Sequence, residues 1–196
     1  NSSAASDVYK RQTEDRRLLD GMRRLATGQS ALLGGKVLID GQPIHRPMAR
    51  DQRVAYIAEN PSQMMLFQDM SYLRNLTFCL PRQIDSWFRR RSIYRSLRRE
   101  LTPELGAVFD KDIRDLNTQE KYALIFRRVL LQQPRVVFFE QPFWGNDVLL
   151  QQHIERQVQL LLAKKIAVVV LIVGIYDAFP LAERTLIYKN GHLLTQ

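Results

Sequence analysis

Cysteine and long apolar runs are scarce in this sequence of 196 residues. A single cysteine, Cys79, excludes an internal disulfide and a cysteine-rich metal cluster. The longest apolar run, residues 166–173, is much shorter than the roughly 20 residues that a membrane-spanning helix needs. No signal peptide is visible either. The sequence therefore indicates a protein of the cytosol, in which any role at a membrane requires a partner.

Acidic residues are outnumbered, since 20 Asp and Glu residues stand against 29 Lys and Arg residues and leave a formal net charge of +9. Such a charge suits nucleic acid, an anionic membrane surface or a solvated basic face. Part of it lies in one segment with the arginines Arg89, Arg90, Arg91, Arg95, Arg98 and Arg99. Only Trp87, Phe88 and Tyr94 could stack on bases there. We therefore favour a solvated helix face and keep nucleic-acid or ribosome binding as the alternative.

The N-terminus differs in character from the rest of the chain. Residues 2–12 resemble the translation of a transposase adapter used in sequencing libraries, and a genuine polar tail is the alternative. We expect residues 1–12 to form a disordered tail that packs against nothing. A single domain is then expected over residues 13–196, and the adapter interpretation places a broken gene end immediately before Thr13.

Hydrophobic periodicity predicts an α/β domain. An amphipathic helix is expected over 16–26, with apolar residues on one face and arginines on the other. The Asp40-Gly41 pair predicts a hairpin over 36–44. Further helices are expected at 70–80, 86–101, 122–130 and 148–164, with breaks at Pro103 and Gly106. The apolar runs 136–139 and 167–173 are typical of buried parallel strands, and 186–194 of a closing hairpin.

The order of these features resembles the ATP-binding cassette of ABC proteins over nearly all of residues 13–196. The hairpin 34–44 matches the one that follows the family's phosphate loop. The strand 54–58 matches the strand before the Q-loop, and Glu59 stands at the position of the family's glutamine. The resemblance implies a fold like that of P-loop NTPases. Its features are a mostly parallel sheet flanked by helices, a small antiparallel β part and a helical insert at about 68–115.

Two further motifs carry the resemblance. The family's signature, LSGGQ, aligns with Leu116 and with Asn117, Thr118, Gln119 and Glu120, so that both glycines are replaced. The Walker B strand aligns with 136–142, where Glu140 replaces the aspartate that holds Mg²⁺ and Gln141 replaces the glutamate that activates water. The resemblance also places Asn146 and Asp147 in the loop that follows the Walker B strand. No histidine stands at 173–177, where the family's switch histidine is expected.

These replacements predict lost hydrolysis. No GxxxxGK[ST] phosphate loop exists in the sequence, and the expected position of helix 16–26 implies that the first strand and the loop are missing. An amide such as that of Gln141 cannot accept a proton, whereas general-base assistance contributes about 10²–10⁴-fold. Glu59, Glu140 and Gln141 remain possible nucleotide and Mg²⁺ positions, but we expect neither ATP nor Mg²⁺ to bind this chain tightly.

The resemblance also implies partners and a location. Cassettes work as pairs, so that a second cassette and a membrane permease are expected partners, at the inner face of the cell membrane. We expect a degenerate cassette that couples to a permease or regulates it. Residues Met64, Met65, Leu66, Phe67 and Met70 would line the groove that receives the permease's coupling helix, because methionine clusters form adaptable apolar surfaces. The alternative is that these residues only cover the sheet.

Overall fold

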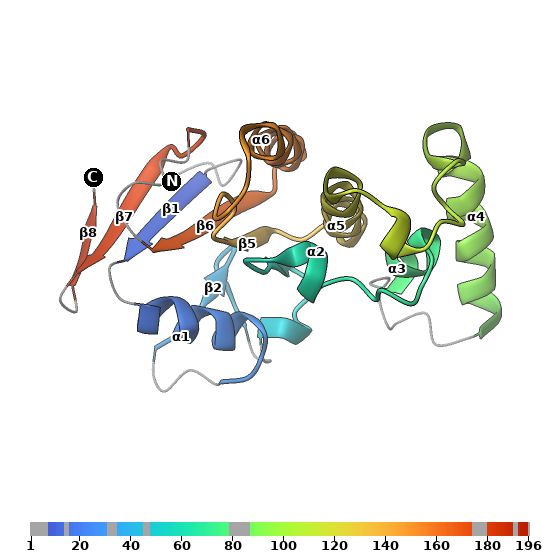
Figure 1. The fold of residues 1–196 in the computed structure, drawn as a ribbon. Helices are drawn as coiled ribbons and strands as arrows, with labels where there is room; N and C mark the ends of the chain where they lie inside the picture. Colours follow the sequence, from blue (N-terminus) through green and yellow to red (C-terminus); the bar gives the residue numbers. More distant parts are fainter. Residues whose placement is uncertain are drawn as a thin grey trace. The chain divides into compact units, whose positions relative to one another are not determined.

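Most strands of the chain belong to one sheet (Figure 1). The computed structural model describes residues 8–13, 16–30, 35–44, 48–78, 87–173, 180–189 and 192–195. One sheet has the strand order β4-β5-β6-β1-β7-β8, parallel throughout except for the β7–β8 pair. Its strands are β1 (Val8–Thr13), β4 (Val54–Ile57), β5 (Val136–Glu140), β6 (Ala167–Val173), β7 (Arg184–Lys189) and β8 (His192–Thr195). The predicted buried strands and the closing hairpin are therefore confirmed.

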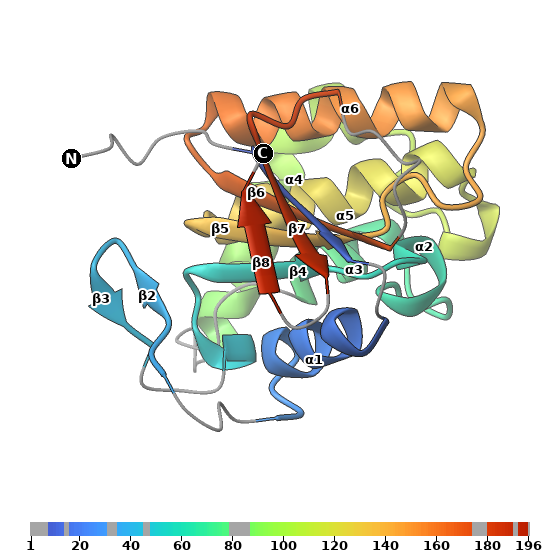
Figure 2. The same ribbon diagram turned by 90° about the vertical axis from the view of Figure 1, so that its left-hand side faces the viewer.

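The chain divides into two compact units, one made of residues 1–59 and 133–196 and the other of residues 60–132. The first unit contains the sheet. Helix α1 (Arg16–Ala26) lies against one face of this sheet and helix α6 (Val148–Ala163) against the other, as both views show (Figures 1 and 2). Both helices have the predicted bounds to within one residue.

A two-residue turn closes the predicted hairpin. Strands β2 (Leu38–Ile39) and β3 (Gln42–Pro43) pair in antiparallel register around Asp40 and Gly41. Both turn residues have positive φ, 52° and 72°, as a type I′ turn requires. A short 3₁₀ helix (Met48–Arg50) follows, and Met48, Ala26 and Val54 form a small core between α1 and the sheet.

The prediction of a disordered tail over residues 1–12 is wrong for residues 8–12, because Val8–Thr13 forms β1 inside the sheet. β1 pairs in parallel with β6 on one side, from Val8↔Val168 to Thr13↔Val173, and with β7 on the other. β6 needs hydrogen-bond partners for the backbone N–H and C=O groups along both of its edges. β5 covers only one of these edges. β1 satisfies the other edge. The strand before α1, expected to be missing, is therefore present, while residues 1–7 lie outside the described residues.

Helices make up the second unit. They are α2 (Pro61–Met64), α3 (Tyr72–Phe78), α4 (Trp87–Leu105), a 3₁₀ turn (Ile113–Asp115) and α5 (Thr118–Gln132). The expected insert at about 68–115 falls within it. Pro103 lies inside α4 instead of ending it, and the helix ends two residues later; the proline removes one hydrogen bond to the carbonyl four residues earlier. Among the described residues no helix has the length and apolar character to cross a membrane.

Candidate functional site

The polar residues predicted for the site meet where the parallel strands end. Glu140 is the last residue of β5, Gln141 follows it, and Glu59 comes two residues after the end of β4. β4 and β5 are parallel neighbours, so that their carboxyl ends lie at the same edge of the sheet. Ligands of open α/β sheets bind at this edge. The structure thus places Glu59, Glu140 and Gln141 at one edge of the sheet, and their role toward a nucleotide or Mg²⁺ remains a prediction.

Alternation along β5 directs Glu140 toward α1. Val136 and Phe138 pack on the small core beneath α1, and side chains two residues apart share a face of a strand. Glu140 therefore emerges on that same face, buried to an exposure of 1%. Tyr56 of β4 packs on the same core and stands beside it.

A helix residue that the sequence reading missed completes the site. α1 buries Leu19 and Ala26, and Arg23 lies between them at helical spacing. Residues three and four apart share one helix face, so Arg23 belongs to the face turned to the sheet. The expectation that the arginines of this helix all lie on its outer face is wrong for Arg23. The spacing of Leu19, Arg23 and Ala26 was the signal that could have identified it.

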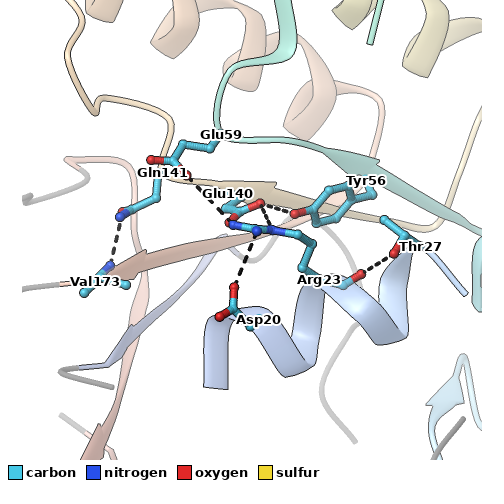
Figure 3. A network of polar contacts seen from close by, with 8 residues as sticks. All are labelled: Asp20, Arg23, Thr27, Tyr56, Glu59, Glu140, Gln141 and Val173. Carbon is cyan, nitrogen blue, oxygen red and sulfur yellow. Dashed lines mark hydrogen bonds and ion pairs between the residues drawn. The ribbon is translucent and has the colours of Figure 1, made fainter. Parts of the chain in front are cut away.

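Arg23, Glu140 and Tyr56 form one hydrogen-bonded network (Figure 3). The Nε of Arg23 lies 3.0 Å from each carboxylate oxygen of Glu140, and its Nη2 donates to Oε1. The Tyr56 hydroxyl donates to Oε2 of the same carboxylate. Asp20 and Glu59 complete the surroundings of the guanidinium at 3.4 and 3.9 Å. Both oxygens of Glu140 are thus engaged by side chains of the chain itself.

The protonation of this network follows from its contacts. The hydrogen bond to Glu140 raises the pKa of Arg23 further above its ordinary value, against the opposing effect of burial. Burial, together with the hydrogen bond to Glu140, raises the pKa of Tyr56. Arg23 therefore stays charged and Tyr56 stays a donor throughout the physiological range.

Gln141 is engaged with the backbone of β6. Its N–H donates to the carbonyl of Leu171 at 2.8 Å, and its side-chain Oε1 accepts from the N–H of Val173 at 3.1 Å. Its φ of 45° lies in the left-handed region, which costs a residue other than glycine about 1–3 kcal/mol. The side chain is buried. At this position the amide therefore joins β5 to β6.

A divalent cation does not fit Glu140 as the residues stand. Mg²⁺ needs free carboxylate lone pairs and nearly ideal octahedral geometry, and Arg23 and Tyr56 already use the oxygens of Glu140. A guanidinium charge about 4 Å away would repel a dication by about 8 kcal/mol at an effective dielectric constant of about 20. No cluster of three or more His, Cys, Asp or Glu side chains suited to a metal occurs within the described ranges.

Known proteins give this geometry a context. No protein-family model matches the chain. The molybdenum import ATP-binding protein ModC of Mycobacterium tuberculosis is 28% identical over 165 residues, which are 81% of this chain and 43% of ModC. The ribose import ATP-binding protein RbsA of Shigella dysenteriae is 21% identical over 189 residues, 88% of this chain and 35% of RbsA.

Solved structures agree in fold. The cbiO1 protein of Clostridium perfringens, part of the ABC transporter complex cbiONQ, superposes with a TM-score of 0.73 at 15% identity, over 97% of this chain and 76% of that one. An ATP-binding cassette of an ABC transporter in its ADP conformation superposes with a TM-score of 0.74, over 97% and 79%. The chain is a distant homologue of the ATP-binding cassettes of ABC transporters. It spans 33% to 47% of the length of the first curated relatives that it matches.

The connection before α1 departs from that of a phosphate-binding cassette. β1 ends at Thr13 and α1 begins at Arg16. The positions between them, 14 and 15, are too few for the residues of a GxxxxGK[ST] loop, whose backbone amides hold phosphates. The sequence itself contains no GxxxxGK[ST] motif, and the loss of phosphate binding remains a prediction.

The segment that aligns with the family's signature has a structural role. Asn117 precedes α5, and its side-chain Oδ1 accepts from the N–H of Glu120 at 2.8 Å. The Glu120 carboxylate in turn accepts from the N–H of Asn117 at 2.8 Å. This reciprocal pair is a capping box, with Thr118 and Gln119 in the first turn of the helix. A nucleotide-binding role of Asn117, Thr118, Gln119 and Glu120 remains a prediction.

None of the contacts described above for the network of Arg23, Tyr56 and Glu140 involves a histidine of the described residues. His153 is on α6, half-buried as a residue, and its Nε2 atom is buried. Burial, together with Arg156, lowers the pKa of His153. His192 is exposed on β8, and His45 lies outside the described residues.

Proposed function

We propose that this chain is the cassette domain of an ABC-transporter-type protein that couples to a membrane permease, or regulates it, at the inner face of the membrane without hydrolysing ATP. The observation that carries the proposal is the saturated carboxylate of Glu140. In place of a water-bridged metal, this carboxylate holds Arg23 and Tyr56. ATP and Mg²⁺ then bind neither tightly nor productively.

The loss of chemistry extends beyond the metal position. Gln141, at the position of the water-activating glutamate, has its amide oxygen bound to the backbone of Val173. An amide is no general base. In addition, the sequence contains no GxxxxGK[ST] phosphate-loop motif. Because three separate requirements fail, one substitution cannot restore hydrolysis.

Exposed apolar side chains support the proposed partners. Of the five residues expected to line the permease groove, Met64 and Phe67 are exposed, by 68% and 40%, whereas Leu66 is buried. Asn75 holds this segment by accepting from the N–H of Phe67 at 2.8 Å and donating to its carbonyl at 3.0 Å. The segment is thus presented by a fixed backbone, as docking of a coupling helix requires.

A second cassette has its own candidate surface. Trp144, Val148 and Leu149 are exposed around the start of α6, next to the Asn146–Asp147 pair. Asp147 caps α6 through the N–H of Leu150 at 2.8 Å, and Asn146 bonds to the carbonyl of Pro142 at 2.8 Å. We assign this surface to the partner cassette.

Nucleic-acid binding is less well supported by the described residues. Arg98, one of the arginines on α4, pairs with Asp110 at 2.7 Å. The side chains of Trp87 and Phe88 lie outside the described residues.

The hydrolysis part of the proposal is tested by steady-state phosphate release with Mg²⁺ and ATP. We expect no release above a blank without protein, both for the wild-type chain and for Gln141→Glu. Release above the blank that disappears in Gln141→Ala would show an active site at this position and would contradict the proposal. An active bacterial cassette assayed in parallel controls for the conditions.

A further inference from the structure

Glu140 is a buried carboxylate whose charge must be compensated by other residues of the chain. A buried, unpaired carboxylate is strongly destabilising, and a partner is required wherever one is retained. The exposure of Glu140 is 1%, whereas the side chain of Arg23 is 36% exposed. The carboxylate is thus enclosed and the guanidinium reaches it from the solvent side.

The partner comes from a different element than the carboxylate. Arg23 is on α1, Tyr56 on β4 and Glu140 on β5, so that one carboxylate joins three elements (Figure 3). A guanidinium that donates through two nitrogens to one carboxylate has a defined direction as well as a charge. These contacts fix the orientation of α1 against the carboxyl ends of β4 and β5.

We propose that Arg23 is a built-in counter-ion that replaces the divalent cation of this site, so that α1, β4 and β5 hold their arrangement independently of metal and nucleotide. The guanidinium stands where a cation would meet Glu140, supplies the positive charge and uses the same oxygen lone pairs. Glu59, 3.9 Å from Arg23 Nη2, shares this counter-ion. The proposal concerns the fold of the chain alone and does not depend on its partners.

Thermal unfolding of the full chain tests the proposal first. We expect the Tm of the wild-type chain to be the same in EDTA, in MgCl₂ and in MgCl₂ with ATP. Arg23→Met should lower Tm by roughly 6–15 °C because it strands a buried charge. Arg24→Met, one residue along on the exposed side of α1, is the matched control and should shift Tm by less than about 2 °C. The double variant Arg23→Met with Glu140→Gln should recover part of the loss.

Mn²⁺, detected by electron paramagnetic resonance, supplies a readout that a purely structural role would not change. Arg23→Met removes the guanidinium and frees Oε1 of Glu140, while Tyr56 still donates to Oε2. We expect this variant to bind Mn²⁺ measurably beside Glu59, while the wild type and Arg24→Met do not. If Arg23→Met does not fold, Arg23→Lys keeps the charge without the bidentate contact and should show an intermediate Tm, still insensitive to EDTA. Mn²⁺ binding by the wild type, a Tm that rises with Mg²⁺ and ATP, or equal effects of the Arg23 and Arg24 variants would overturn the proposal.

Discussion

At the scale of single residues, the Tyr56 hydroxyl is a donor to a carboxylate that water hardly reaches. Hydrogen bonds to charged groups contribute about 1.5–3 kcal/mol. Tyr56→Phe keeps the ring in the small core beneath α1 and removes only this donor. We expect the free energy of unfolding to fall by about 1.5–3 kcal/mol, measured by urea denaturation. Tyr188→Phe on β7 is the control, and equal losses in the two variants would contradict the assigned role of Tyr56.

The same hydroxyl predicts a dependence on pH. Because its pKa is raised by burial and by Glu140, the folded chain keeps the proton above pH of about 10, where an unfolded tyrosine loses it. A group with a raised pKa contributes its full stability below the unfolded value, and this contribution falls as the pH rises further. The advantage of the wild type over Tyr56→Phe should therefore be constant between pH 7 and about 9 and shrink toward about pH 11. Urea midpoints across this range measure it, and a growing difference would refute the assignment.

A site residue can be predicted when the sequence pattern that indicates it lies close to it in the chain. Glu140 and Gln141 follow a continuous apolar strand, and Glu59 follows another, which is typical of buried parallel strands. The resemblance to the cassette family then implied that these residues share one edge of the sheet. Arg23 was missed because arginine is usually solvated on a helix face. Only the buried carboxylate opposite, 117 positions away in the sequence, explains an arginine on the inner face. Its presence there is a tertiary effect.

At the scale of elements, the start of α5 shows how the residues aligned with the signature stabilise a helix. Asn117 and Glu120 satisfy N–H groups that a helix start leaves free. We expect Asn117→Ala to lower the free energy of unfolding by about 0.5–2 kcal/mol, by urea denaturation. Adding Glu120→Ala should cost less than in the wild type, because the two bonds form one box. Strict additivity of the two losses would show that the caps act separately.

The sheet shows where sequence reasoning stops at the scale of elements. β5 and β6 were predictable because they are apolar on both faces, as central parallel strands are. β1 has Lys10, Arg11 and Gln12 among its six residues and lacks this signature. Its place between β6 and β7 is decided by the unpaired edges of these strands, which are formed by residues more than 150 positions later in the chain. The Asp40-Gly41 hairpin, by contrast, is decided by its own turn residues.

At the scale of the whole molecule, the net charge of +9 and the apolar segment point to two different kinds of partner. The exposed Met64 and Phe67 suit an apolar helix of a permease, and the exposed Arg95 and Arg99 on α4 suit phosphates. Charge substitutions at exposed positions leave the fold largely unaffected. The two explanations can therefore be separated by variants that fold normally.

We expect Met64→Asp with Phe67→Asp to abolish co-purification with a co-expressed permease of the same genome, because a carboxylate in an apolar helix interface is left without a partner. Arg95→Glu with Arg99→Glu, the matched pair on α4, should leave that co-purification unchanged. Circular dichroism establishes that both double variants are folded. The same proteins are titrated with single-stranded RNA at two salt concentrations. Permease binding that survives the aspartates, together with RNA binding that is lost in the glutamate pair, would favour the nucleic-acid alternative, since phosphate contacts weaken with salt and with each lost arginine.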